Sequence, residues 1–95
     1  MENGDVRILV CDDERDVREL LQEYLQKRGF MVSTSGNGEE LRKVLGEFDI
    51  DLIVLDINMP GEDGLSILRS LRPDNPMPVI MLTAAGGVVD RIIGL

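Results

Sequence analysis

Residues 51–64 read DLIVLDINMPGEDG, and this stretch decides the fold. Its apolar run, Leu52–Leu55, is short and continuous, which is typical of a strand buried on both faces of a parallel sheet. The run stops at Asp56, and the proline and glycines that follow are typical of a turn. We predict four strands, because similar runs occur at Ile8–Cys11 and Val79–Leu82 and a weaker one at Phe30–Val32.

The segments between these runs have helical periodicity. Residues 17–25 place apolar side chains at i, i+3, i+4, i+7 and i+8, so one face of this helix is apolar. On its solvent side Glu14 and Arg18 form an i,i+4 pair, and Asp12 or Asp13 can cap its start. Further helices are predicted at 41–48 and 65–71, and a fourth begins with Val89, Ile92 and Ile93. This βαβαβαβα alternation predicts an α/β fold, a doubly wound parallel sheet with helices on both faces.

The composition limits the classes of function. The chain has 95 residues, enough for one domain, and its net charge of −8 argues against nucleic acid or an anionic membrane as a direct partner. No apolar run approaches the ~20 residues of a membrane span, and we expect a cytoplasmic protein. The chain has no histidine and one cysteine, which excludes histidine-dependent catalysis, an internal disulfide and a cysteine-based zinc site. Any chemistry must therefore depend on carboxylates, hydroxyls and backbone groups.

Polar residues follow three of the predicted strands at their carboxyl ends. Asp12 and Asp13 follow the first strand, Asp56 follows the third and Thr83 follows the fourth. If the first and third strands are neighbours, three carboxylates share one small site at this edge of the sheet. Such a cluster requires a raised pKa or a bound cation, and an all-oxygen donor set favours Mg²⁺ over Zn²⁺. We therefore predict a magnesium site where Asp56 accepts a phosphoryl group and the Thr83 hydroxyl donates to a phosphate oxygen.

Each of these residues also has a purely structural interpretation. An acidic pair at a helix start is an ordinary cap, and a single aspartate after a strand is an ordinary turn residue. Cys11 lies in a buried run, where we expect a small apolar side chain, and the acidic pair 62–63 is expected to be solvated. Residues 36–38 read GNG, but they follow the second strand and lack the third glycine of a dinucleotide-binding loop. The convergence of three strand ends favours the magnesium site.

Three segments together resemble the receiver domain of bacterial two-component response regulators. They are residues 8–14, ILVCDDE, residues 51–64 quoted above, and residues 78–84, PVIMLTA. The resemblance covers essentially the whole chain in the family's order, and it implies a flavodoxin-like sheet with strand order 2-1-3-4. Residues 90–95, DRIIGL, are similar to the branch of the family that carries a DNA-binding winged helix downstream, which implies an output in transcription.

The resemblance also implies how the metal is held. Asp13 and Asp56 bind Mg²⁺ through their side chains, and Asn58 binds it through its backbone carbonyl. Asp12 acts through a metal-bound water. In this interpretation Asp56 is both a metal ligand and the phosphoacceptor.

The phosphoryl group has its own contacts and donor in the same resemblance. Thr83 and the Ala84 N–H contact the phosphoryl group, and Thr83 is the switch residue that moves toward it. Asn58 helps to set how quickly the acyl phosphate hydrolyses. The implied phosphodonor is a phosphohistidine on a sensor histidine kinase, so the domain catalyses its own modification.

The family pattern continues past the last residue of this sequence. Family members have a fifth strand with a lysine at its end and then a final helix, whereas this sequence stops before that position. We therefore expect residues 1–95 to be a C-terminally truncated receiver domain with no fifth strand, whose fourth strand is an open apolar edge. Such a chain is a truncated form, the ordered part of a longer one, or a chain that completes its core as a homodimer.

Two functions stay open on the sequence alone. The first is a phosphoacceptor receiver domain, and the second is an interaction or dimerisation module that is not phosphorylated. A third class, the hydrolases with an aspartate nucleophile, needs a second acid two residues after the nucleophile. That position is occupied by Asn58.

Overall fold

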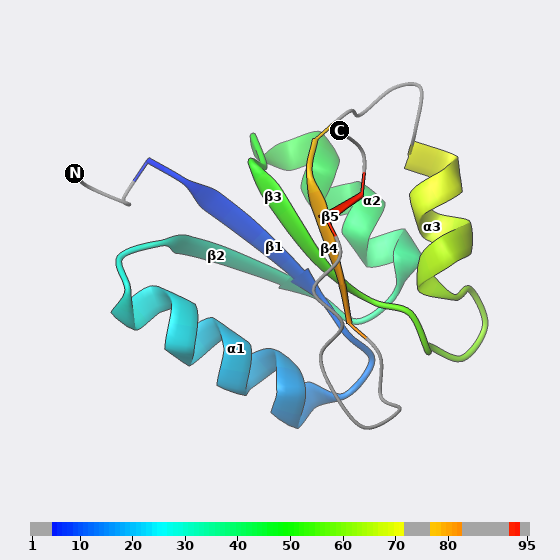
Figure 1. The fold of residues 1–95 in the computed structure, drawn as a ribbon, viewed down its shortest axis with the longest axis horizontal. Helices are drawn as coiled ribbons and strands as arrows, with labels where there is room; N and C mark the ends of the chain where they lie inside the picture. The colour runs from blue at the N-terminus through cyan, green and yellow to red at the C-terminus, as the bar shows by residue number, and fades with distance from the viewer. Residues whose placement is uncertain (1–4, 72–76, 83–91, 94–95) are drawn as a thin grey trace.

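Strands and helices alternate along the chain. The structure is a computed structural model that describes residues 5–71, 77–82 and 92–93 (Figure 1). Its strands are β1 (Arg7–Cys11), β2 (Met31–Ser35), β3 (Leu52–Asp56), β4 (Val79–Leu82) and β5 (Ile92–Ile93). Its helices are α1 (Arg15–Lys27), α2 (Gly38–Glu47) and α3 (Gly64–Leu71). The apolar runs thus form the strands, and the periodic segments between them form the helices, as the sequence predicts.

The strands form one sheet in the order β2-β1-β3-β4-β5. The pairs β1–β2, β1–β3 and β3–β4 are parallel, which confirms the α/β fold and the strand order 2-1-3-4 of a flavodoxin-like sheet. Between β1 and β3 the register runs from Ile8 opposite Leu52 to Cys11 opposite Leu55. The carboxyl ends of β1 and β3 therefore lie side by side at one edge of the sheet (Figure 1).

The end of the chain differs from the prediction. Ile92–Ile93, expected at the start of a fourth helix, forms the two-residue strand β5, which runs antiparallel to β4 and pairs Ile92 with Ile80. The helix prediction at these residues is therefore wrong, and Val89 lies outside the described residues. β-Branched side chains favour strands, and the edge of β4 offers unpaired backbone groups to a returning segment. Consequently β4 is paired on this side at Val79 and Ile80, where an open edge was expected.

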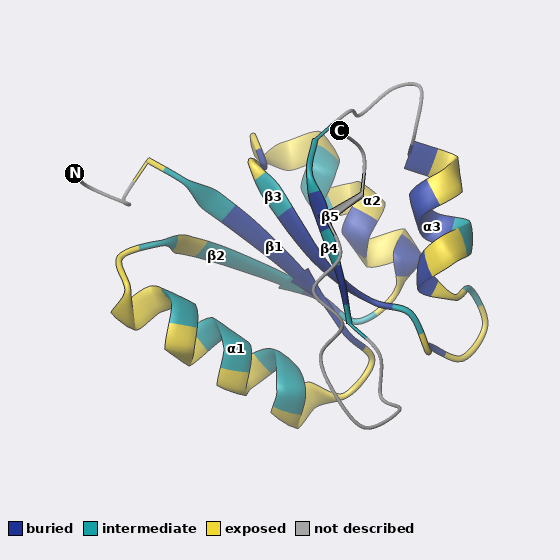
Figure 2. Ribbon diagram, viewed as in Figure 1, coloured by how far each residue is buried: buried dark blue, intermediate teal, exposed yellow. Residues whose placement is uncertain are grey.

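The two faces of the sheet are covered unequally. Helices α2 and α3 lie against one face and α1 lies against the other (Figure 1). Successive β1 residues alternate between them, so that Leu9 and Cys11 join the core under α2 and α3, whereas Ile8 and Val10 face α1. Figure 2 shows buried residues on the inner sides of α2 and α3, whereas α1 has none. The main hydrophobic core therefore lies between the sheet and α2 and α3.

Cys11 belongs to this core. Its side chain is fully buried, and its Sγ lies 3.6 Å from the carbonyl oxygen of Asn37 at the start of α2. Burial raises the pKa of the Cys11 thiol to about 11, so the thiol stays protonated at neutral pH. These properties confirm its interpretation as a small apolar side chain.

The start of α3 packs directly on the end of β3. The Gly64 N–H donates to the carbonyl oxygen of Ile57 at 3.0 Å, and the Asp63 carboxylate accepts from the Ser66 N–H at 2.8 Å. A Cβ at Gly64 would clash with the carbonyl oxygen of Asp56 and would lie 2.9 Å from the Ile57 Cα. Only a residue without a side chain fits this approach, so glycine here sets the path of the loop that follows Asp56.

Two glycine substitutions test this packing. Gly64→Ala should lower the free energy of unfolding by roughly 3 kcal/mol, because the new methyl group meets backbone atoms that cannot rotate away. The matched control is Gly46→Ala in α2, where nothing lies within 4 Å of an added methyl group. There alanine should raise the free energy of unfolding by up to about 1 kcal/mol. Urea denaturation followed by circular dichroism measures the free energy of unfolding of both variants. Equal effects of the two substitutions would contradict the close approach of Gly64 to the backbone of Asp56 and Ile57.

Candidate functional site

Three carboxylates converge at the carboxyl edge of the sheet. Asp12 directly follows β1 and Asp56 is the last residue of β3, so the register of Cys11 opposite Leu55 places the two acids next to each other. With Asp13, they offer carboxylate oxygens that all lie within 4.8 Å of one another. The structure therefore brings together the three acids that the sequence analysis expected at this edge.

Two of the three acids are buried, and this changes their chemistry. Asp12 is 4% exposed and Asp56 is 6% exposed, whereas Asp13 is exposed. Burial raises the pKa of Asp12 above its ordinary value of 3.8, and the charge of Asp13 raises it further. Burial also raises the pKa of Asp56, and the charges of Asp12 and Asp13 act in the same direction. Keeping these clustered carboxylates ionised therefore costs free energy, and a bound cation would lower that cost.

The loop between β1 and α1 holds Asp12 by backbone contacts. The Asp12 N–H donates to the Ser35 carbonyl at 3.1 Å, and its Oδ1 accepts from the Glu14 N–H at 2.9 Å. Glu14 is the N-cap of α1, so the interpretation of Asp12 or Asp13 as the helix cap is wrong. Arg18 also departs from its expected surface pair with Glu14, because its Nη1 donates to the Asp12 carbonyl oxygen at 2.7 Å. No local sequence signal indicates this contact, since it depends on the path of the loop.

The loop after β3 positions Asp56 in a similar way. The Asn58 N–H donates to Asp56 Oδ1 at 3.1 Å and opposes the rise in its pKa. The Ile57 N–H donates to the Leu82 carbonyl oxygen at 2.8 Å, which ties this loop to the end of β4. Asn58 is exposed beside the cluster. The predicted phosphoacceptor thus lies between the other two acids and the carboxyl end of β4.

The structure does not describe Thr83 and Ala84, two of the predicted site residues. Both lie outside the described residues, directly after Leu82 at the end of β4. Their predicted contacts with a phosphoryl group stay predictions.

The donor atoms of the cluster suit a hard divalent cation. All of the clustered groups are carboxylates, and Mg²⁺ prefers oxygen ligands. Each Mg²⁺–oxygen bond is about 2.1 Å long, so ligands on opposite sides of the ion lie about 4.2 Å apart. The 4.8 Å span of the three carboxylates is close to this value. A magnesium ion therefore fits the cluster with small side-chain adjustments.

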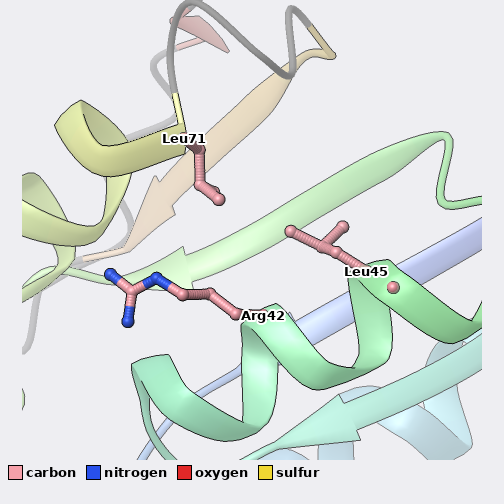
Figure 3. Close-up of a pocket in the computed structure, with 4 residues that line it drawn as sticks. Arg42, Leu45 and Leu71 are labelled. Carbon is pink, nitrogen blue, oxygen red and sulfur yellow. The ribbon is translucent and has the colours of Figure 1, made fainter.

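A separate cavity of about 260 Å³ lies between α2 and α3 (Figure 3). None of the three aspartates lines it; its lining residues are Arg42, Leu45, Gly46 and Leu71. The Arg42 guanidinium forms a two-bond ion pair with the Glu62 carboxylate, at 2.6 and 3.0 Å, and donates to Ser70 Oγ at 2.8 Å. Glu62 therefore links the β3–α3 loop to α2, while its side chain stays 39% exposed to solvent. Among the described residues that line the cavity, Arg42 is the one titratable group, so we assign the chemistry to the acidic edge.

The chain matches a known family along nearly its whole length. The model of the response regulator receiver domain matches residues 8–95. Among curated relatives, the transcriptional regulatory protein GltR of Pseudomonas aeruginosa is 43% identical over 91 residues, and the protein PetR of Rhodobacter capsulatus is 43% identical over 88 residues. Each alignment covers 93% of this chain but only 38% and 37% of the relatives, so the chain spans less than two-fifths of their length.

Solved structures show the same relationship. The response regulator protein TrrA of Thermotoga maritima, in complex with Mg²⁺-BeF, is 44% identical with a TM-score of 0.78, covering 85% of this chain and 71% of that one. The structure of the histidine kinase ThkA in complex with TrrA matches at 43% identity and a TM-score of 0.78, with 86% and 72% covered. This chain therefore belongs to the family of response regulator receiver domains, the receiving modules of two-component systems.

Among the described residues, no helix has the length and apolarity needed to cross a membrane.

The raised pKa values predict a pH dependence of magnesium binding. Carboxylates bind the metal only when deprotonated. Because the pKa values of Asp12 and Asp56 lie above 3.8, Mg²⁺ affinity should begin to fall on acidification while ordinary aspartates are still ionised. Isothermal titration calorimetry across pH 7.5 to 4 measures this decline. An affinity that stays constant until the pH approaches 3.8 would contradict the raised values.

The same cluster predicts a stabilising substitution. A buried acid with a raised pKa favours the folded state most at low pH, and this contribution is lost as the pH rises through the folded-state pKa. At pH 7 and without Mg²⁺, Asp56→Asn should therefore raise the free energy of unfolding by about 1 kcal/mol. Added Mg²⁺ should stabilise the parent chain and have much less effect on the variant. Thermal melts with and without EDTA measure both effects. If Asp56→Asn is less stable than the parent in EDTA, the repulsion among the three carboxylates is refuted.

Proposed function

We propose that this domain accepts a phosphoryl group on Asp56 from a phosphohistidine of a sensor histidine kinase, with Mg²⁺ as cofactor. The observation that carries the proposal is the convergence of Asp12, Asp13 and Asp56 within 4.8 Å, with Asp56 buried at the end of a central strand. The family of the chain and the neighbouring complex of a histidine kinase with a response regulator support the same function.

In this proposal four residues hold the metal. Asp13 and Asp56 would bind it through carboxylate oxygens, Asn58 through its backbone carbonyl, and Asp12 through water. A bound Mg²⁺ would neutralise the clustered carboxylates and lower the repulsion between Asp56 and the incoming phosphoryl group. The all-oxygen donor set of the cluster supports magnesium over zinc.

The chain itself supplies the nucleophile and its orientation. Asp56 Oδ1 accepts the Asn58 N–H at 3.1 Å, and we therefore assign the other oxygen, Oδ2, as the attacking atom. An Oδ2–phosphorus bond forms while the phosphorus–nitrogen bond of the donor breaks, and the departing imidazole takes up a proton. The product is an acyl phosphate on Asp56. We assign the Thr83 hydroxyl and the Ala84 N–H to the phosphoryl oxygens as part of this proposal.

The position of Asp56 supports a switch at the end of β4. Asp56 pairs with Leu82 in the β3–β4 register, and the next residue, Ile57, donates its N–H to the Leu82 carbonyl. The acyl phosphate carries up to two negative charges where the carboxylate carried one, so phosphorylation adds up to one negative charge beside this strand end, directly before Thr83. We propose that this charge change moves Thr83 and controls an output in transcription, in keeping with the regulators named above. The net charge of −8 favours DNA binding by another domain over this one.

Incubation with acetyl phosphate and Mg²⁺ tests the phosphoacceptor. Intact-mass spectrometry should show a gain of one phosphoryl group that is lost in Asp56→Asn and in the presence of EDTA. Asp63→Asn is the matched control, because Asp63 is an exposed aspartate in the same loop, and it should be modified like the parent. Absence of any gain in the parent chain would refute the proposal for residues 1–95 and favour an interaction module that is not phosphorylated.

A further inference from the structure

Arg18 has a place in the acidic site that its position on α1 does not indicate. It lies in the first turn of the helix, where its backbone N–H donates to the Glu14 carbonyl at 3.1 Å. Side chains on a helix lean toward its N-terminus. The half-buried Arg18 side chain accordingly reaches back to the β1–α1 loop and donates from Nη1 to the Asp12 carbonyl oxygen at 2.7 Å.

This contact adds a third hydrogen bond to Asp12. The Asp12 N–H is held by Ser35 and its Oδ1 by the Glu14 N–H, which leaves the carbonyl oxygen to Arg18. That oxygen belongs to the peptide that joins Asp12 to Asp13. Because a peptide unit is planar, anchoring its oxygen also sets the direction in which Asp13 leaves the strand.

The guanidinium is also confined from the side of the β2–α2 loop. A methyl group at Gly36 would lie 3.1 Å from Arg18 Nη1 and 3.3 Å from Glu40 Oε1. Glu40 Oε1 in turn accepts the Gly36 N–H at 2.7 Å. Arg18 is therefore enclosed between the two loops that follow β1 and β2, and glycine at position 36 leaves the room it occupies.

We propose that Arg18 is a positioning residue of the magnesium site. It orients the Asp12–Asp13 peptide so that both carboxylates can interact with one Mg²⁺ ion. This inference rests on the magnesium-binding part of the proposed function. It makes a prediction opposite to that of simple electrostatics. A positive charge beside a cation site repels the cation, so its removal should tighten Mg²⁺ binding if charge were its only effect. If Arg18 positions the ligands, its removal should weaken binding.

Magnesium titrations of the full chain separate these two effects. Backbone amide NMR shifts follow the binding of Mg²⁺ alone and report whether each variant is folded. Arg18→Met keeps much of the side-chain length but has no donor, and it should bind Mg²⁺ about ten-fold more weakly. Arg18→Lys, which retains a donor and the charge, should recover most of this loss. Arg15→Met is the matched control, because it removes the same charge from the 79% exposed Arg15 of the same helix, and it should bind Mg²⁺ as well as the parent or slightly better.

A second variant crowds Arg18 without changing the net charge. Gly36→Ala places a methyl group against the guanidinium and should weaken Mg²⁺ binding about three-fold, which also tests the proposal if Arg18→Met does not fold. Binding by folded Arg18→Met as tight as that of Arg15→Met would overturn the positioning role, as would unchanged binding by Gly36→Ala. Failure of the parent chain to bind Mg²⁺ would instead refute the proposed function, and the role of Arg18 with it.

Discussion

One register of the sheet determines the chemistry of this domain. β1 and β3 run parallel as direct neighbours, with Cys11 opposite Leu55, so the acids that end these strands lie side by side. A strand order that did not place β1 beside β3 would separate Asp12 from Asp56. The cluster of like charges is unfavourable for folding by itself. It persists because β1 and β3 are flanked by other strands and buried between helices, and these elements hold their ends in place.

The loops around the cluster add a second level of control. Backbone N–H groups of Glu14 and Asn58 each bind one carboxylate of the cluster, which orients the acids before any ligand arrives. Gly64 allows α3 to start against the end of β3, and the ion pair between Arg42 and Glu62 ties the same loop to α2. The site is thus preorganised from both sides of the sheet, by the start of α1 around Asp12 and by the β3–α3 loop around Asp56.

Much of this arrangement follows from local sequence patterns. Short apolar runs and amphipathic segments predict buried strands and covering helices, because burial on two faces or on one stripe leaves a direct signature in the sequence. The same patterns place Asp12, Asp13 and Asp56 at strand ends, and parallel strands bring such ends to one edge. Periodicity could not say which strands are neighbours. The order 2-1-3-4 came from the resemblance to receiver domains, and the structure confirms it.

Other features depend on contacts that no local sequence pattern encodes. The sequence predicts that Arg18 pairs with Glu14 on the helix surface. In the structure the path of the β1–α1 loop brings the Asp12 carbonyl oxygen within hydrogen-bond distance of Arg18. The ion pair of Arg42 with Glu62 joins residues 20 positions apart. Ile92–Ile93 has too few residues for its period to distinguish helix from strand, and the available edge of β4 decided the outcome. The sequence alone thus determined the elements from β1 to β4 and the acidic residues, because their signals are local. The tertiary structure alone decided which polar groups hold them, because hydrogen bonding depends on distances that no periodicity encodes.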